Sequence, residues 1–185
     1  MSQLKRRYLA IALLVATLAA GAYWWATDYA TRAPEVALTT TSGKVIHLSA
    51  LRGHPVLVTF WATTCPSCMK ELPQLSQLYR DLAPRGLKLI GISVYYDPPT
   101  QVTEVMRAFK IPYPVVNDVM MTAARAFRMV RLVTPTTFLI GPDGHVVARY
   151  TGPLDFPRLR ARIDGMLDGR TRTAALDVPA AHRKD

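Results

Sequence analysis

Short apolar runs alternate with amphipathic segments through the middle of the chain. Pro55–Trp61 and Leu87–Val94 are β-type runs short enough to be buried strands. Between them, leucines recur at nearly helical spacing, at Leu72, Leu75, Leu78 and Leu82. This spacing predicts a helix over residues 65–82, which Pro73 should kink and which Pro84 and Gly86 end.

The same patterns predict the other elements of a domain at residues 43–168. The expected strands cover 45–48, 113–116, 136–140 and 145–150, the last two joined by a turn at 141–144; the expected helices cover 100–109, 119–128 and 155–168. Strands that alternate with helices, followed by a hairpin and a helix, indicate an α/β sandwich with a mixed central sheet flanked by helices.

The N-terminus carries an uncharged segment of membrane-spanning length, Tyr8–Thr27. As a helix it would span about 30 Å, the thickness of a bilayer's hydrocarbon core. Lys5, Arg6 and Arg7 precede it, so the positive-inside rule places residues 1–7 in the cytoplasm and the domain outside. Tyr23, Trp24 and Trp25 suit an interfacial aromatic belt.

A cleaved signal peptide is the alternative interpretation, since Ala19–Ala22 offers small residues for cleavage. Either way the domain lies in an extracytoplasmic compartment, which in a bacterium means the periplasm or the outer face of the inner membrane. Residues 28–42 are expected to be a polar linker, and residues 169–185 a flexible tail.

The net charge of +10 has several contributions late in the chain, from Arg158, Arg160, Arg162, Arg170, Arg172, Arg183 and Lys184. A solvated basic surface near anionic lipid is the simplest interpretation, and a face for an acidic protein partner is the alternative. Nucleic acid is not expected as a partner, because the chain has no motif that combines aromatic and basic residues for that purpose.

The only two cysteines, Cys65 and Cys68, lie where a predicted strand ends and a predicted helix begins. Two thiols three positions apart can close a short disulfide ring and open it again. A thiol at a helix start is acidified by unpaired N–H groups and the helix dipole, which favour the thiolate. This arrangement predicts dithiol/disulfide exchange, with a structural disulfide or half of a zinc site as alternatives.

With these cysteines and two further segments, the chain resembles the thioredoxin fold. It is most similar to the membrane-anchored, extracytoplasmic disulfide reductases of the TlpA/ResA/CcmG (DsbE-like) type. The resemblance covers roughly residues 35–168 and rests on Gly53–Ala62, the CxxC pair followed by Glu71 and Pro73, and Val133–Ile140. It implies a thioredoxin fold with a βα unit inserted after the CxxC helix.

The resemblance also implies roles for individual residues. Cys65 would be an exposed nucleophile and Cys68 the buried resolving thiol. Pro135 would be a cis-proline facing the pair, with Thr134 before it helping to select substrate. Trp61, Pro66 and Ser67 complete the expected substrate-binding residues, and no metal or cofactor is expected beyond the redox-active pair.

Glu71 follows Cys68 by one helical turn, where this family carries a carboxylate near the active site. It would tune the thiol pKa values and relay protons. Cytoplasmic thioredoxins have a buried Asp on the strand before the motif, where this chain has Thr59, which cannot titrate. Glu71 therefore becomes the nearest candidate, with an ordinary exposed helical Glu as the alternative.

The resemblance implies a reductant of protein disulfides, re-reduced by a membrane donor of the DsbD/CcdA type. Apocytochrome c or a metal-centre assembly protein is the expected substrate. Two departures leave the direction open: many relatives have Trp where Thr64 stands and Pro where Ser67 stands. Strong oxidants of the DsbA type also have Pro directly after the first cysteine, as Pro66 is here, so a disulfide-forming oxidase is the first alternative.

Two further alternatives fit the residues less well. Copper-binding assembly factors of the Sco type space their cysteines CxxxC and add a distant His, whereas this chain has CxxC. Peroxiredoxins need Thr or Ser three residues before the reactive cysteine and Pro seven residues before it. Ala62 and Val58 occupy those positions here.

Overall fold

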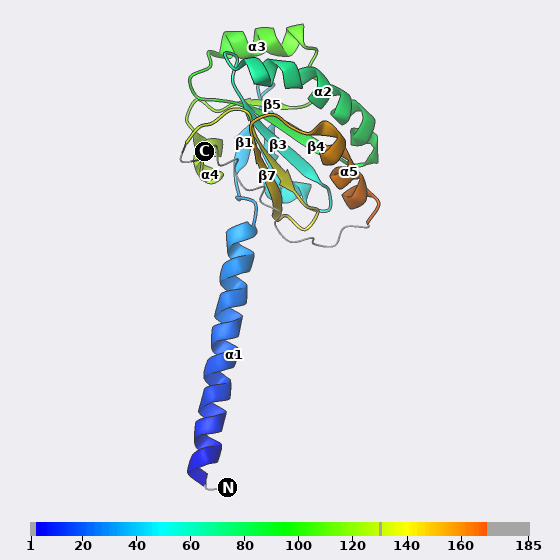
Figure 1. Cartoon of the computed structure of the whole chain (residues 1–185). Coiled ribbons are helices and arrows are strands. Elements are labelled where there is room, and N and C mark those ends of the chain that lie inside the picture. The colour runs from blue at the N-terminus through cyan, green and yellow to red at the C-terminus, as the bar shows by residue number, and fades with distance from the viewer. Residues whose placement is uncertain (1–2, 130, 170–185) are drawn as a thin grey trace, which may run out of the picture. The chain divides into compact units, whose positions relative to one another are not determined.

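The computed structural model describes residues 3–129 and 131–169 of the chain. The chain divides into two compact units at Arg32/Ala33, and each is described by itself. In the second unit, a five-stranded sheet has the order β5-β4-β3-β6-β7 (Figure 1). Its strands are β3 (Val56–Trp61), β4 (Lys88–Ser93), β5 (Val115–Asn117), β6 (Thr136–Ile140) and β7 (Val146–Thr151).

The sheet is mixed, as the sequence predicts. β3 and β4 pair in parallel, and β4 and β5 do the same. β6 runs antiparallel to both β3 and β7. Helices α2 (Pro66–Leu82), α3 (Pro99–Ala108), α4 (Thr122–Ala126) and α5 (Phe156–Leu167) connect or follow these strands. This is the thioredoxin-like α/β fold. Between β4 and β6, after the CxxC helix, the chain forms α3, β5 and α4.

Two apolar cores cover the two faces of the sheet. All six residues of β3 are buried, so this central strand contributes side chains to both cores. Leu57 and Trp61 join the core that includes side chains of α2, α3 and α5. Val56, Val58 and Phe60 join the core that includes side chains of α4. The strand that leads into Cys65 is therefore held from both sides.

Part of the segment expected to be a linker is structured. β1 (Ala37–Thr39) pairs antiparallel with β2 (Val45–His47), and Leu38 is buried. Thr41 donates a backbone hydrogen bond to Val115 of β5. The polar composition of residues 28–42 hid this hairpin, because only a single side chain of β1 is buried.

The helix expected over 119–128 is shorter than predicted. Only Thr122–Ala126 is helical, and Met121 before it and Arg128 after it have φ values of 55° and 51°. The Asp118 carboxylate accepts hydrogen bonds from the backbone N–H groups of Ala123 and Ala124, at 3.0 and 2.8 Å. The left-handed residues bound the helix at both ends, which an apolar pattern alone does not reveal.

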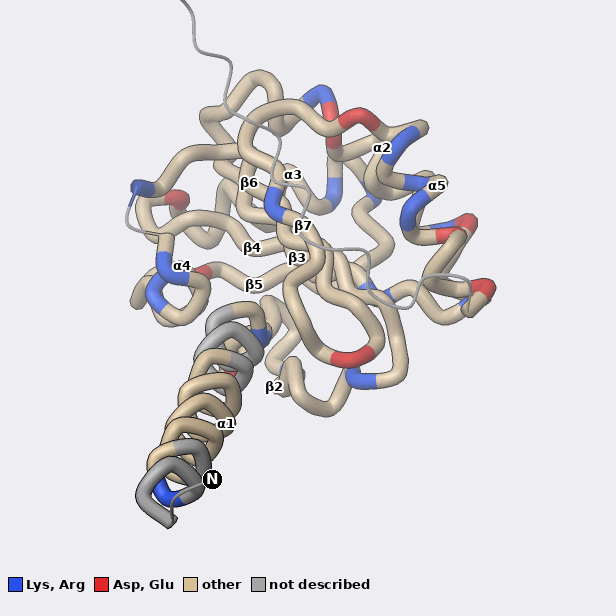
Figure 2. The backbone as a smooth tube through the Cα atoms, turned by 60° about the horizontal axis from the view of Figure 1, so that its bottom comes forward, with Lys and Arg blue, Asp and Glu red and all other residues tan. Residues whose placement is uncertain are grey.

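Lys and Arg residues of α2 and α5 are interspersed with Asp and Glu residues along the backbone (Figure 2). Arg160 of α5 pairs with Asp81 of α2 at 2.6 Å, and Arg85 pairs with Asp164 and, at 2.9 Å, with Asp168. Exposed pairs of this kind contribute little to stability, because solvent screens their charges. Part of the late positive charge is thus paired; the predicted tail, with Arg170, Arg172, Arg183 and Lys184, lies outside the described residues.

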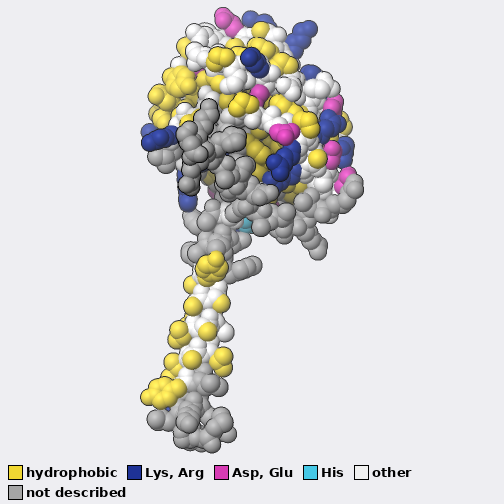
Figure 3. Space-filling model, in the orientation of Figure 1, with side chains coloured by type: hydrophobic (Ala, Val, Ile, Leu, Met, Phe, Trp, Pro, Cys, Tyr) yellow, Lys and Arg dark blue, Asp and Glu magenta, His cyan; other side chains and the backbone are white. Residues whose placement is uncertain are grey.

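The first unit contains helix α1 (Gln3–Thr31), 29 residues long. The side chains from Ile11 to Tyr23 are exposed, and hydrophobic side chains lie along the described length of the helix (Figure 3). The side chains of Trp24 and Trp25, expected to form an interfacial belt, lie outside the described residues. A search of the described part of the chain finds no helix long and apolar enough to cross a membrane.

Candidate active site

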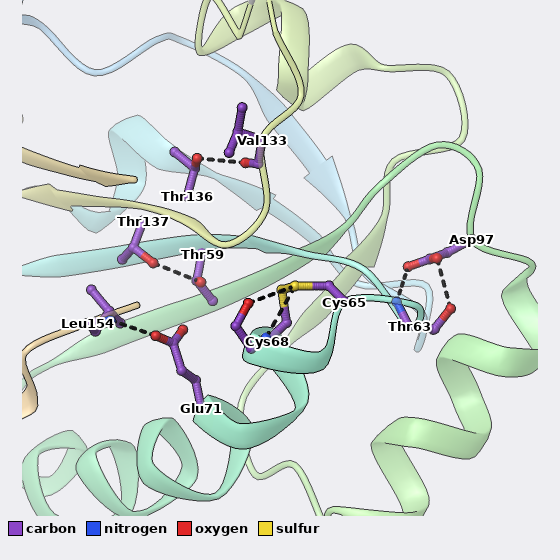
Figure 4. The surroundings of a disulfide bond; sticks show 11 residues. Thr59, Thr63, Cys65, Cys68, Glu71, Asp97, Val133, Thr136, Thr137 and Leu154 are labelled. Atoms are coloured by element: carbon purple, nitrogen blue, oxygen red, sulfur yellow. Dashed lines mark hydrogen bonds between the residues drawn. A yellow bond between two sulfur atoms is a disulfide. The ribbon is translucent and has the colours of Figure 1, made fainter. Parts of the chain in front are cut away.

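Cys65 and Cys68 lie where β3 gives way to α2, and they form a disulfide (Figure 4). Their sulfurs are 2.15 Å apart and their Cα atoms 5.2 Å apart. Cys65 is the N-cap of α2, with extended backbone angles, and Pro66 occupies the first helical position. A proline is favoured there because the missing N–H would have had no helical partner. The local sequence thus starts the helix at the reactive pair.

The two sulfurs differ in exposure and in hydrogen bonding. Cys68 is 1% exposed, whereas Cys65 is half-buried rather than fully exposed as expected. The Cys65 sulfur accepts a hydrogen bond from the Cys68 backbone N–H at 3.2 Å. The Ser67 hydroxyl lies 3.3 Å from the same sulfur and donates to it, since a disulfide sulfur carries no proton. These donors would also stabilise a Cys65 thiolate.

Glu71 projects from the same helix and is only 5% exposed. One carboxylate oxygen accepts a hydrogen bond from the Leu154 backbone N–H at 2.6 Å. Burial raises the pKa of the Glu71 carboxyl above its ordinary value, and the Leu154 hydrogen bond offsets part of that rise. Glu71 is therefore not an ordinary exposed helical residue but a buried group that holds a proton more readily.

Thr59 lies in β3, at the position where cytoplasmic thioredoxins carry a buried Asp, and it has a partner on the neighbouring strand β6. Its hydroxyl lies 2.9 Å from the Thr137 hydroxyl, and the two residues are directly paired across β3 and β6. Each residue is 1% exposed. The pair is a buried, neutral hydrogen bond close to the disulfide and to Glu71 (Figure 4).

The loop before β6 contains a cis peptide bond between Thr134 and Pro135, as expected. The Pro135 carbonyl accepts from the Gly152 backbone N–H at 2.8 Å, and the Thr136 hydroxyl donates to the Val133 carbonyl at 2.7 Å. Figure 4 places this loop among the surroundings of the disulfide. The structure thus brings the loop between Val133 and Thr136 near the CxxC pair, from a segment about seventy residues later in the chain.

The residues expected to contact substrate differ in exposure. Pro66 is exposed, Ser67 and Thr134 are half-buried, and Pro135 is buried. Trp61 is only 1% exposed, so its indole belongs to the core beneath the site and does not line the surface above it. Its pocket exists because Gly91 on β4 has no side chain: a Cβ there would lie 3.2 Å from the indole nitrogen.

Exposed apolar side chains lie in the loops at the end of the sheet that carries the disulfide. The parallel strands β3, β4 and β5 have their C-terminal ends here, and the antiparallel β6 begins here. The loops at these strand ends expose Tyr95, Tyr96, Val119, Met120 and Val133. The Tyr95 and Tyr96 rings contact each other edge to face, with centroids 5.2 Å apart. Apolar groups around an exchangeable disulfide suit a protein substrate better than a small polar one.

Asp97 is a buried residue of the site that the sequence analysis missed. It is 2% exposed, and its carboxylate accepts from both the backbone N–H and the hydroxyl of Thr63, at 2.9 and 2.8 Å. Thr63 lies two residues before Cys65. The signal in the sequence was weak, because an aspartate after a strand, followed by Pro98 and Pro99, resembles an ordinary exposed turn.

A half-buried cysteine that caps a helix, a buried cysteine one turn later and a cis-proline loop together define a thioredoxin-fold protein that exchanges dithiols and disulfides. The chain belongs to the AhpC/TSA family, whose model matches residues 30–149. Within it the chain is a thiol-disulfide oxidoreductase of the ResA type.

Two relatives and one solved structure illustrate the similarity. ResA from Bacillus subtilis strain 168 is 35% identical over 66% of this chain and 66% of its own length. ResA from Geobacillus kaustophilus is 30% identical over 83% of this chain and 92% of its own length. A thiol:disulfide interchange protein from Chlorobium tepidum has 30% identity and a TM-score of 0.67, covering 74% of this chain and 96% of that one.

Proposed function

We propose that this protein is a membrane-anchored, extracytoplasmic oxidoreductase that reduces disulfides in other proteins. The observation that carries the proposal is the asymmetry of the pair: Cys65 is half-buried at the start of α2 and Cys68 is buried behind it. A substrate disulfide can reach the first sulfur, and only the mixed disulfide formed there is close to the second.

The proposed reaction begins with the reduced pair. The Cys65 thiolate attacks one sulfur of a substrate disulfide; a Cys65–substrate bond forms, and the other substrate sulfur leaves as a thiolate and takes up a proton. The Cys68 thiol then loses its proton and attacks the Cys65 sulfur. The Cys65–Cys68 bond forms, the second substrate thiolate leaves, and two electrons have passed to the substrate.

Glu71 is the proposed acceptor of the Cys68 proton. It lies one turn further along α2, and its burial favours the protonated carboxyl at a higher pH than usual. A carboxylate with a raised pKa is a better base than an exposed one. Thr59 and Thr137 cannot take this role because neither hydroxyl titrates in this range.

The oxidised pair must be reduced again before the next turnover. A membrane electron donor of the DsbD/CcdA type would supply two electrons and two protons by the reverse exchange, through its own dithiol. Apocytochrome c or a metal-centre assembly protein is the proposed substrate. A polypeptide partner is supported by the exposed apolar residues in the loops around the disulfide, which are Tyr95, Tyr96, Val119, Met120 and Val133.

The location is proposed from the sequence of α1. Tyr8–Thr27 carries no charged residue, and Lys5, Arg6 and Arg7 precede it. An anchor with that charge bias leaves the domain outside the cytoplasm, where an exchangeable disulfide can persist.

The reduction potential of the Cys65–Cys68 pair tests the direction. A reductant should have a potential nearer that of thioredoxin, about −270 mV, than that of DsbA, about −120 mV. A value near DsbA's would overturn the reductant assignment and leave the exchange activity intact. Independently, Cys68→Ser should accumulate mixed disulfides at Cys65 with the natural substrate.

A disulfide-forming oxidase is the second candidate, because Pro66 follows the first cysteine directly and is exposed beside it. Thiol trapping in living cells separates the two directions. A pair held mostly as the dithiol supports the reductant, and a pair held mostly as the disulfide supports the oxidase.

A further inference from the structure

We propose that Asp97 is a positioning residue which, through Thr63, shifts the equilibrium of the Cys65–Cys68 pair toward the disulfide and so makes the dithiol more reducing. The inference rests on the thiol-disulfide exchange activity and does not depend on the direction proposed above. It concerns residues 62–64, which lie between β3 and Cys65 and have no role in the proposed mechanism.

The contact between Asp97 and Thr63 is a two-point clamp. One carboxylate oxygen accepts from the Thr63 backbone N–H at 2.9 Å, and the other accepts from the Thr63 hydroxyl at 2.8 Å. Both oxygens act as acceptors, as in an ionised carboxylate. The ion pairs of the described residues include none to Asp97, so its charge is compensated by neutral donors.

The loop that carries Asp97 is itself fixed to the end of the sheet. The Asp97 backbone N–H donates to the Val94 carbonyl at 3.1 Å, and the Val94 N–H donates to the Trp61 carbonyl at 3.1 Å. The Asn117 side chain also donates to the Asp97 carbonyl, at 3.4 Å. The clamp therefore connects the ends of β3, β4 and β5 to the turn that precedes the cysteines.

That turn sets the position of the nucleophile. The Cys65 N–H donates to the Ala62 carbonyl at 3.1 Å, so Thr63 lies inside the turn that delivers Cys65 to the N-cap of α2. The Asp97 carboxylate holds Thr63, in the middle of this turn, through both the backbone N–H and the hydroxyl of Thr63. Cys65 is therefore placed by a contact that spans 34 residues of sequence.

The sign of the effect follows from charge. The N-terminus of α2 favours a negative charge, and in the reduced protein the Cys65 thiolate is the group at its N-cap. Asp97 binds Thr63, which lies two residues before Cys65. A buried carboxylate at that place disfavours a second negative charge on the Cys65 sulfur, because like charges repel more strongly where water is scarce. The dithiol form, which carries the thiolate, is destabilised relative to the neutral disulfide.

The experiment measures the equilibrium of the full-length protein with a glutathione redox buffer at one pH. Asp97→Asn removes the charge and retains an acceptor oxygen; we expect the equilibrium to move about tenfold toward the dithiol, which is about 30 mV less negative. Thr63→Val removes the hydroxyl donor to Asp97, together with the 3.3 Å contact of that hydroxyl to the Gln101 side chain, and leaves the Asp97 carboxylate less compensated. It should move the equilibrium at least about twofold the other way, by the same repulsion.

Asp118→Asn is the matched control. Asp118 is also a buried carboxylate, 5% exposed, that accepts two hydrogen bonds from residues nearby, and it caps α4. This variant should lose stability in urea and leave the glutathione equilibrium within about twofold of wild type, since its role is the helix cap.

The outcomes are decisive in either direction. An unchanged equilibrium in Asp97→Asn, a shift toward the disulfide, or an equal shift in Asp118→Asn would overturn the proposal. If Asp97→Asn does not fold, the sign of the Thr63→Val shift decides: a move toward the disulfide supports the proposal, and no move or the reverse overturns it. A DsbA-like potential of the wild-type protein would refute the reductant assignment, but it would not affect the shifts of the variants relative to wild type.

Discussion

The carboxylate of Glu71 on α2 accepts a hydrogen bond at 2.6 Å from the backbone N–H of Leu154, which lies 83 residues later in the chain. Glu71 thereby connects the helix of the reactive pair to the segment between β7 and α5. Buried carboxylates are costly unless hydrogen-bonded, and among the described residues the Leu154 backbone N–H is the donor to this one. The residue combines a contact between distant segments with a carboxyl whose pKa burial raises.

The first prediction concerns stability and pH at Glu71. Because burial raises its folded-state pKa, the stabilising contribution of the protonated form is complete below the unfolded value, near 4.5, and is lost as the pH rises through the folded value. Glu71→Gln keeps an acceptor for Leu154 without a charge. The free energy of unfolding of Glu71→Gln, relative to that of wild type, should therefore increase as the pH rises above 4.5.

Urea unfolding at a series of pH values measures this difference, with Glu104→Gln on the exposed face of α3 as control. The control should follow wild type at every pH. If the stability of Glu71→Gln relative to wild type instead decreases with rising pH, the ionised carboxylate is favoured in the folded protein.

The second prediction concerns the reactivity of the two thiols. In the reduced protein, iodoacetamide should modify Cys65 at least about tenfold faster than Cys68, because exposure and thiolate character both favour the N-cap sulfur. Mass spectrometry of a time course gives both rates. In Cys65→Ser, the remaining Cys68 should stay slow; equal rates for the two thiols would contradict the assignment of nucleophile and resolving residue.

The third prediction concerns the buried Thr59–Thr137 pair. Thr59→Val retains the side-chain shape and leaves the Thr137 hydroxyl buried without its partner, which should cost about 1–3 kcal/mol of unfolding free energy. Adding Thr137→Val should recover more than half of that loss, because both polar groups are then gone. Urea unfolding of both single variants and the double variant gives the coupling.

Thr103→Val on α3 serves as the exposed counterpart, since its hydroxyl donates to the Pro99 carbonyl at the surface. It should change the unfolding free energy by less than about 0.5 kcal/mol. If the losses of unfolding free energy in the Thr59→Val and Thr137→Val variants simply add in the double variant, the two hydroxyls do not stabilise each other.

The fourth prediction concerns the N-terminal segment. Residues 1–42 fused to a reporter that is active only outside the cytoplasm should give activity in the membrane fraction, because an apolar helix with basic residues before it inserts in that orientation. Residues 28–42 alone should give none. Activity in a soluble fraction, with a reporter that begins after Ala22, would instead identify a cleaved signal peptide; a cytoplasmic reporter would contradict both.

Much of the fold was predictable because strands and helices bury regular patterns. β6 at Thr136–Ile140 matches its predicted range, and β3 and α2 each begin one residue later than predicted. The errors lie where local geometry overrides pattern. Met121 and Arg128 adopt left-handed backbone at the ends of α4, and β1 buries only one side chain in a polar stretch. Neither feature has a periodic signal.

The sequence by itself determined the reactive pair, since Cys65 and Cys68 need only their own spacing and the start of a helix to be recognised. It also indicated Pro135 and Glu71, through positions shared with relatives. Only the tertiary structure decided the surroundings of these residues: Leu154 beside Glu71, Thr137 beside Thr59, Asp97 around Thr63, and Trp61 in the core. Those partners lie 34 to 83 residues apart in the chain. Hydrogen bonds between distant segments depend on how the strands are ordered, and no local pattern encodes that order.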